Sequence, residues 1–318
     1  MKLLRVNTEL TKSPESAAQF IRSGGIVAFP TETVYGLGAD VFDEKAIAKI
    51  FEAKQRPADN PLIIHLGTLE QLSDLVLEIP DSAQRFIDAF FPGSLTLVLK
   101  KSALVPLIVS AGLDTVGVRM PENAVANEFL QHCGIPVAAP SANISGRPSP
   151  TTWEAVFDDL NDRIDCILQG EAAAFGLEST VVDCTSANPL ILRSGAVSLE
   201  LLREIVPSIK MQSDHGNEII RSPGLKHKHY APNAKVVIVD AEFILPQTSL
   251  NAFIGIYMPS GNPHFVKMCG SVDDYAHWLF AFFRACDKRQ VDTIYCQTVP
   301  EVGIGAALMD RLRRAEAR

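Results

Sequence analysis

The sequence predicts an α/β fold in two parts, a large N-terminal part and a small C-terminal one. Hydrophobic residues make up 47% and charged residues 21% of the 318 residues, a composition typical of a globular chain long enough for two domains. Short apolar runs with β-branched residues alternate with segments of helical period, and this alternation is typical of α/β domains. We place the large domain at residues 1–206, a linker at 207–233 and the small domain at 234–318.

The first two helices are indicated by their capping residues. In SPESAAQFIRSGG, Ser13 is a candidate N-cap, Pro14 lies in the first turn, and two glycines end the helix before the strand IVAFP. In DEKAIAKIFEAKQ, Asp43 is the candidate cap, and apolar residues recur at helical spacing. This second pattern places Lys54 at a helix end.

The rest of the large part continues the same alternation. Strands are expected in the runs PLIIHL, LTLVLKK, TVGVRMP, PVAAPSA, DCILQ, STVVDCT and LILRSGA. Helices are expected near residues 81–91, 123–133, 151–160 and 198–206. The loops between these elements carry most of the unusual polar residues.

The alternation stops near residue 207. The stretch PSIKMQSDHGNEIIRSPGLKHKHYAPNA is polar and has few core-forming residues, so it predicts a linker that is long for a connection inside a compact domain. Beyond it, a small α/β unit is predicted by the runs KVVIVD, FIGIYMP, DDYAHWLFAFFRACDKR, TIYCQT and GIGAALMDRLRRA.

Charge and cysteine content limit the functional classes. Lys and Arg total 29 against 37 Asp and Glu, a net charge of -8, which argues against a general polyanion binder and requires any phosphate site to be local. The six cysteines form no C-x-x-C pair, which argues against a zinc ribbon or a thioredoxin-type motif and predicts reduced thiols. No uncharged run approaches the ~20 residues of a membrane span, and MKLLRVNTEL lacks a long apolar segment, so we expect a cytoplasmic protein without membrane contact.

Standard nucleotide-binding and hydrolase signatures are absent from the sequence. The patterns G-x-x-x-x-G-K-[ST], G-x-S-x-G and H-E-x-x-H do not occur, and neither GLGADV nor GIGAAL completes a dinucleotide fingerprint. Hydroxyl, glycine and cationic residues instead gather in loops that follow the predicted strands. This distribution predicts a site that is formed by several loops rather than by a single motif.

Each loop cluster also has an ordinary structural explanation. Lys54 and Arg56 would offset the dipole of the helix that they end, and His65 after four apolar residues is typical of a half-buried histidine. Arg119 and Arg193 lie inside strand-like runs with few acids nearby in sequence, so a bound anion and a distant carboxylate are open as partners. Together, these hydroxyls, glycines and cations favour a ligand that carries phosphate and carboxylate groups.

Seven motifs, in order, resemble those of the YrdC-like family, the threonylcarbamoyl-AMP synthases. They are FPTETVYGLGAD, KQRPADNPLIIHL, PGSLTLVL, AGLDTVGVRMP, APSANISGRPSPT, GLESTVVD and LRSGAVS. SPGLKHKHYAPNAKV followed by a small α/β unit resembles the longer members, which add a linker and a C-terminal domain. The resemblance covers nearly the whole chain and implies a large YrdC-like domain with a twisted mixed sheet plus a small Rossmann-like α/β domain.

The family's reaction, which the resemblance implies, joins L-threonine, bicarbonate or CO2, and ATP into threonylcarbamoyl-AMP with release of pyrophosphate. The product serves the threonylcarbamoyladenosine modification of tRNA, so downstream tRNA threonylcarbamoyl-transfer proteins are implied partners, and direct tRNA binding is left open. The carbamate nucleophile is already anionic, so no Ser-His-Asp apparatus is needed. Mg²⁺ is the implied cofactor and would bridge oxygens of the triphosphate.

The motif positions also imply site residues. The threonine and carbamate pocket would contain Thr33, His65, Arg119, Ala139 and Ser179. The ATP site would contain Lys54, Arg56, Asn60, Thr115, Ser141, Ser149, Arg193 and Tyr230. In this assignment Arg119 binds the carboxylate of threonine, and Tyr230 closes over the nucleotide as part of a linker that acts as a lid. No metal ligand is assigned among the protein side chains.

Two other functions stay open at the level of sequence. The same fold could be a double-stranded RNA-binding module that grips phosphates, although the acidic net charge counts against it. It could also be the carbamoyl-adenylating module of a hydrogenase-maturation carbamoyltransferase, although that assembly carries zinc-finger cysteine pairs that this chain lacks. The C-terminal unit shows no catalytic cluster, so we expect it to have an interaction or regulatory role.

Overall fold

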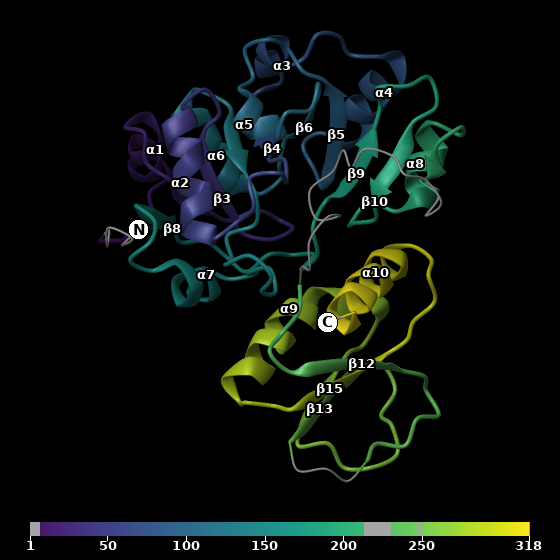
Figure 1. Ribbon diagram of the computed structural model, residues 1–318. Coiled ribbons are helices and arrows are strands. Elements are labelled where there is room, and N and C mark those ends of the chain that lie inside the picture. The colour runs from purple at the N-terminus through teal and green to yellow at the C-terminus, as the bar shows by residue number, and fades with distance from the viewer. Residues whose placement is uncertain (1–6, 213–229, 247–249, 318) are drawn as a thin grey trace.

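The computed structural model describes residues 7–212, 230–246 and 250–317, which form a large and a small α/β domain (Figure 1). Within these residues the large domain contains an 11-stranded sheet and the small domain a separate four-stranded sheet. The predicted fold class, a large mixed-sheet domain with a small α/β domain after it, is confirmed.

The large sheet is mixed. Its strands are β1 (Glu9–Thr11), β2 (Val27–Phe29), β3 (Gly36–Asp40), β4 (Ile63–His65), β5 (Leu95–Lys100), β6 (Thr115–Arg119), β7 (Val137–Ala139), β8 (Cys166–Leu168), β9 (Thr180–Asp183), β10 (Leu190–Arg193) and β11 (Lys210–Met211). Their order is β1-β8-β2-β3-β7-β4-β6-β5-β9-β10-β11. Antiparallel pairs such as β5 with β6 stand beside parallel pairs such as β4 with β6. In the parallel pair His65 lies opposite Arg119, and β7 brings Ala139 opposite Ile63 on the other side of β4.

The helices of the large domain are α1 (Pro14–Arg22), α2 (Glu44–Lys54), α3 (Leu72–Leu75), α4 (Asp81–Phe90), α5 (Leu107–Ser110), α6 (Ala124–Cys133), α7 (Trp153–Leu160) and α8 (Leu199–Ile205), with a 3-10 turn at Leu69–Gln71. The first two begin at the caps expected from the sequence, whereas two short helices, α3 and α5, were not expected. Ser13 Oγ accepts a hydrogen bond from the Ser16 amide at 3.2 Å, and Asp43 Oδ1 accepts one from the Lys45 amide at 2.9 Å. Such caps contribute about 0.5–2 kcal/mol each to stability.

The end of α2 sets the direction of the following loop. Gln55 adopts a left-handed conformation with φ of 52°, and the Arg56 amide donates to the carbonyl of Phe51 at 2.9 Å. The chain therefore turns sharply at the helix end, which gives Lys54 and Arg56 different surroundings.

The small domain is a parallel sheet covered by two long helices. Its strands β12 (Lys235–Val239), β13 (Asn251–Gly255), β14 (Phe265–Met268) and β15 (Thr293–Gln297) have the order β12-β15-β13-β14. Helices α9 (Val272–Lys288) and α10 (Ile304–Glu316) lie on the side of this sheet that faces the large domain (Figure 1). The core of the small domain includes Tyr275, Phe280 and Phe283, none of which is exposed.

The two domains share apolar and ionic contacts. Val34 and Leu177 of the large domain pack in the same hydrophobic cluster as Phe280 of α9. Arg284 of α9 also donates to both carboxylate oxygens of Asp159 in α7, at 3.2 and 2.8 Å. The small domain is therefore docked on the large one rather than tethered beside it.

The predicted linker is described only at its two ends. Residues 207–212 contain β11, which pairs with β10 in the large sheet, and Tyr230 is buried at the start of the small domain. Residues 213–229 lie outside the described residues, so the domain boundaries at 206 and 234 and the lid role of 207–233 stay predictions. Among the described residues, no helix is both long enough and apolar enough to cross a membrane.

Candidate active site

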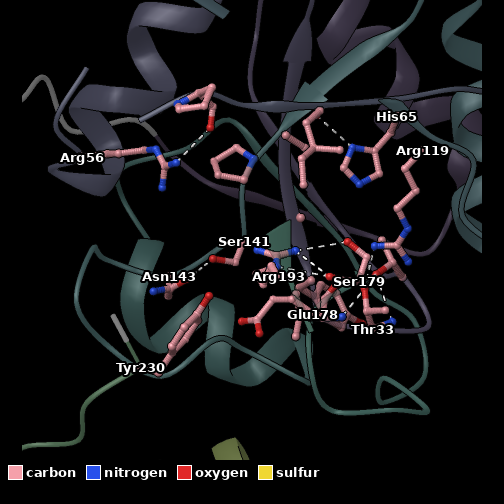
Figure 2. A pocket seen from close by; sticks show the side chains of 18 of the residues that line it. Thr33, Arg56, His65, Arg119, Ser141, Asn143, Glu178, Ser179, Arg193 and Tyr230 are labelled. Atoms are coloured by element: carbon pink, nitrogen blue, oxygen red, sulfur yellow. Dashed lines mark hydrogen bonds between the residues drawn. The ribbon is translucent and has the colours of Figure 1, made fainter. Parts of the chain in front are cut away.

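A pocket lies where loops of the large domain meet Tyr230 (Figure 2). It is lined by Thr31, Thr33, Val34, Tyr35, Gly36, Arg56, Pro61, Ile63, His65, Arg119, Ala139, Pro140, Ser141, Asn143, Arg147, Glu178, Ser179, Arg193 and Tyr230. All five residues expected for threonine line it. Of the residues expected for ATP, those that line it are Arg56, Ser141, Arg193 and Tyr230. Residues from motifs spread over most of the large domain therefore meet in one place.

The lining of the pocket is cationic although the whole chain is acidic. The residues that line it include four arginines, Arg56, Arg119, Arg147 and Arg193, and one carboxylate, Glu178. The chain has a net charge of -8, so this cationic lining is a local feature. Such a concentration of guanidinium groups suits an anionic ligand.

Arg119 at the end of β6 is buried and has partners within the protein. Its Nε donates to the carbonyl of Gly93 at 3.2 Å, its Nη1 donates to Thr33 Oγ1 at 2.8 Å, and its Nη2 pairs with Glu32. Burial acts to raise the pKa of Glu32, but the charge and hydrogen bonds of Arg119 lower that pKa overall. Of the two partners that the sequence left open for Arg119, the distant carboxylate is present.

His65 on the neighbouring strand is a neutral acceptor. Its Nδ1 lies 3.2 Å from the carbonyl of Ile63, and since a carbonyl only accepts, Nδ1 carries the proton. Burial, and then the charge of Arg119, lowers the pKa of His65 to about 3. The ring is therefore uncharged at neutral pH, and its Nε2 presents a lone pair rather than a cation.

The neutral state of His65 predicts a pH dependence of stability. Its pKa is about 3 in the folded protein against 6.5 for the ordinary group, so the unfolded chain binds the extra proton first as the pH falls. Stability from this group is complete above pH 6.5 and is lost at about 1.4 kcal/mol per pH unit below it. Urea unfolding from pH 7 to 5 should therefore give a steeper loss for the wild type than for His65→Gln. Equal slopes would contradict a neutral buried His65.

Arg193 at the end of β10 holds the backbone and the hydroxyl of Ser179. Its Nη2 donates to the Ser179 carbonyl at 2.9 Å and to Ser179 Oγ at 3.2 Å. Thr96 Oγ1 lies 2.8 Å from the same hydroxyl. Burial lowers the pKa of Arg193. This contact joins a residue expected at the ATP site to one expected at the threonine site.

Glu178 is a pocket residue that our assignment from the sequence missed. Its Oε1 accepts a hydrogen bond from Ser149 Oγ at 2.6 Å, and its Oε2 accepts one from Arg311 Nε at 2.8 Å. Burial acts to raise its pKa, but Arg311 and then Arg193 lower it overall. Its position in the motif GLESTVVD could have indicated that it belongs to the site. Its partner Arg311 lies 133 residues away in the sequence, so the pairing could not be predicted. Ser149, expected at the ATP site, bonds Glu178 and does not line the pocket.

Three further residues expected at the ATP site lie behind the pocket surface. Lys54 is buried and donates from Nζ to the carbonyls of Ser141 and Asn143, so it braces the loop that carries Ser141. Burial, and then the charge of Arg56, holds the pKa of Lys54 well below its usual value. Asn60 is buried, and Thr115 begins β6, about 13 Å from Arg119 at the rise of a strand.

Arg56 has an unused donor. Its Nη2 donates to the carbonyls of Asn60 and Pro61, at 3.3 and 3.1 Å. Its Nε is buried and has no hydrogen-bond partner among the described residues. Burial lowers the pKa of Arg56 to about 10, which still leaves it charged at neutral pH. Arg56 nonetheless lines the pocket, so its guanidinium charge contributes to the site.

The described residues do not form a ready metal site. No group of three or more His, Cys, Asp or Glu that could hold a metal ion occurs within residues 7–212, 230–246 and 250–317. The carboxylate of the pocket, Glu178, already accepts from Ser149 and Arg311.

Fold and pocket together define a two-domain α/β protein whose site is built for an anionic ligand. Residues 19–195 match the family described as Telomere recombination, and residues 197–317 match the one described as Threonylcarbamoyl-AMP synthase, C-terminal domain. The chain belongs to the threonylcarbamoyl-AMP synthase family, which confirms the family predicted from the sequence motifs.

Individual relatives match along nearly the whole chain. A threonylcarbamoyl-AMP synthase of Pyrococcus abyssi is 43% identical over 314 residues, which cover 94% of this chain and 92% of the relative. The corresponding protein of Bacillus subtilis is 39% identical over 330 residues, which cover 96% and 94%. The crystal structure of P. abyssi Sua5 complexed with L-threonine has a TM-score of 0.89 at 40% identity and covers 98% of this chain and 97% of that one. The matched regions thus span both domains.

Proposed function

We propose that this protein is an L-threonylcarbamoyladenylate synthase, which makes threonylcarbamoyl-AMP and pyrophosphate from L-threonine, bicarbonate or CO2, and ATP. One observation carries this proposal. All five residues expected for threonine, Arg119 among them, line one pocket, and three more arginines line it too. The names of the full-length relatives and the threonine complex of the P. abyssi protein support it.

The threonine end of the pocket lies around Arg119 and His65 in this proposal. The Nη1 edge of Arg119, which now holds the hydroxyl of Thr33, would bind the carboxylate of the amino acid. The neutral His65 Nε2 would accept the hydroxyl proton of threonine, which a charged ring could not do. Ala139 and Ile63 would provide an apolar wall for the threonine methyl group.

The nucleotide end lies around Arg56, Arg193 and Tyr230. The guanidinium group of Arg56 would donate to the triphosphate, and the ring of Tyr230 would face the nucleotide. The other residues expected at the ATP site would support the loops that line the pocket, as Lys54 supports the loop of Ser141. They are Lys54, Asn60, Thr115 and Ser149. Mg²⁺ would arrive bound to the phosphate oxygens of ATP, which are the ligands that it prefers.

The chemistry requires alignment and charge neutralisation. The ammonium group of threonine first loses a proton to solvent. The amine then adds CO2 and releases a second proton to solvent to give a carbamate, and a carbamate oxygen attacks the α-phosphorus of ATP. The new P–O bond forms as the bond to the β-phosphate oxygen breaks, and pyrophosphate leaves with that electron pair. Arginines around the phosphates would stabilise the charge that develops, so a dedicated base is unnecessary.

Pyrophosphate release from ATP tests the proposal. We expect release that needs both threonine and bicarbonate, with serine slower by about 1–3 kcal/mol in activation free energy because it lacks the methyl group. Glycine, which lacks the whole side chain, should be slower still. Release that does not depend on the amino acid would contradict the assignment.

The product must pass to another protein before water hydrolyses it. Threonylcarbamoyl-AMP is a mixed anhydride that water destroys, so proteins that transfer the threonylcarbamoyl group to tRNA are the proposed partners. The neutral His65 does not favour the alternatives of an RNA-binding module or a carbamoyltransferase module, and neither do the names of the full-length relatives.

A further inference from the structure

The helix α10 of the small domain places one arginine inside the large domain. Arg311 has no exposed surface, although it belongs to a domain with its own core. Its Nε donates to Glu178 Oε2 at 2.8 Å, its Nη2 donates to the carbonyl of Ser194 at 2.9 Å, and its Nη1 pairs with Asp310. A buried cation with this many partners is fixed in position.

The partners of Arg311 lie on the two chain segments that carry Ser179 and Arg193. Glu178 directly precedes Ser179, and Ser194 directly follows Arg193. The segments touch at Gly195, where any Cβ would overlap the backbone of Ser179 and Thr180. Arg311 therefore ties the two segments together at the point where only glycine permits their contact.

Arg311 also supports the ring of Tyr230. Its guanidinium carbon lies 5.2 Å from the centre of that ring, whose centre is 5.5 Å from that of Phe280 in a stacked arrangement. Tyr230 has a φ of 71°, a conformation that an L-residue keeps only where its surroundings impose it. Two helices of the small domain thus fix the side chain of a pocket residue.

The threonine end of the pocket has anchors of its own. Thr33 is held by Arg119, and the hydroxyl of Ser179 is held by Thr96 as well as by Arg193. Ser149, by contrast, bonds Glu178, and Tyr230 packs against Arg311 and Phe280. The contacts of Arg311 therefore act on the nucleotide end.

We propose that Arg311 is a positioning residue of the nucleotide site, so that the small domain completes the ATP site and is more than an interaction unit. Acting through Glu178 it sets Ser149, and by direct contact it sets Tyr230. This inference rests on the proposed function in that it takes ATP as the ligand of this end of the pocket.

Steady-state kinetics and ATP titration of Arg311→Gln test the proposal. We expect the KM and the Kd for ATP to rise about tenfold, while the KM for threonine stays within about twofold. Arg311→Lys keeps the charge but loses the planar fork, so its values should lie between. A thermal melt of each variant shows whether the protein is folded at the assay temperature.

Two further variants separate positioning from general docking. Arg313→Gln, on the same helix, removes an exposed ion pair with Glu301 and should leave the KM for ATP at the wild-type value. Arg311→Gln combined with Glu178→Gln should bind ATP no more weakly than Arg311→Gln alone, because the two residues act in one chain of contacts. Additive losses, or equal rises in both KM values, would overturn the proposal.

The titration also separates this inference from the proposed function. ATP binding needs no turnover, so an unchanged Kd for Arg311→Gln refutes the positioning role whether or not the wild type releases pyrophosphate. Conversely, a wild type that binds ATP but shows no threonine-dependent release contradicts the proposed function alone.

Discussion

Replacing Arg119 by alanine is expected to abolish L-threonine binding and to lower the free energy of unfolding by about 3–5 kcal/mol. The stability loss follows from Glu32, whose buried carboxylate would keep Ser94 and the Glu122 amide as hydrogen-bond donors but lose its cation. The binding loss follows from the proposed role of Arg119 at the amino-acid carboxylate. ATP binding should survive, because none of the hydrogen bonds that Arg119 makes among the described residues reaches Arg56, the arginine proposed for the phosphates.

A double variant separates the two losses. In Arg119→Ala/Glu32→Gln the neutral amide removes the unpaired charge, so most of the lost stability should return while threonine binding does not. Isothermal titration with threonine and with ATP, together with urea unfolding of both proteins, measures each effect. Threonine binding by the double variant, or equal loss of both ligands, would show that Arg119 serves the fold alone.

Local signals in the sequence predicted local structure well. The caps Ser13 and Asp43 and the apolar spacing of the first two helices depend on neighbours within a few residues, and both helices begin where expected. The runs expected as strands in the large domain likewise contain strands β4 to β10. Interactions of this kind are encoded within one turn or one strand.

Elements that depend on packing between distant segments could not be predicted from the sequence. Strand β3 lies in GLGAD, which glycine content favours as a loop, yet a Cβ at Gly38 would clash with Val137 of β7 and crowd the ring of Phe29. Glycine is needed there so that a strand can lie close to its neighbours. Propensity alone therefore gives the wrong answer for this segment.

For the candidate site, too, local motifs could be read from the sequence but contacts between distant segments could not. The motifs correctly predicted threonine-site residues that share one pocket. They did not predict that Arg119 pairs with Glu32, 87 residues away, or that Arg311 binds Glu178 from the other domain. Ion pairs between remote segments leave no periodic trace in one sequence. For the same reason Lys54, expected to grip phosphate, was not recognised as a brace for the carbonyls of Ser141 and Asn143.

Replacing Arg56 by alanine is expected to weaken ATP binding by about 1.5–3 kcal/mol, roughly 10- to 150-fold in Kd. Arg56 lines the pocket, so its guanidinium group would neutralise charge on the phosphates. The protein itself should lose at most about 1 kcal/mol, because only the bonds to the carbonyls of Asn60 and Pro61 and a helix-end charge are removed. Isothermal titration with ATP and a thermal melt give the two numbers.

Arg22 provides the matched control for Arg56. It also lies at a helix end, in the last turn of α1, and it donates to a backbone carbonyl, that of His132, but it does not line the pocket. Arg22→Ala should therefore show a similar small loss of stability with an unchanged Kd for ATP. Arg56→Lys keeps the charge without the guanidinium fork, so its Kd should lie between those of the wild type and Arg56→Ala. If Arg56→Ala binds ATP as tightly as Arg22→Ala does, then Arg56 only offsets the helix dipole, and the phosphates must be held elsewhere in the pocket.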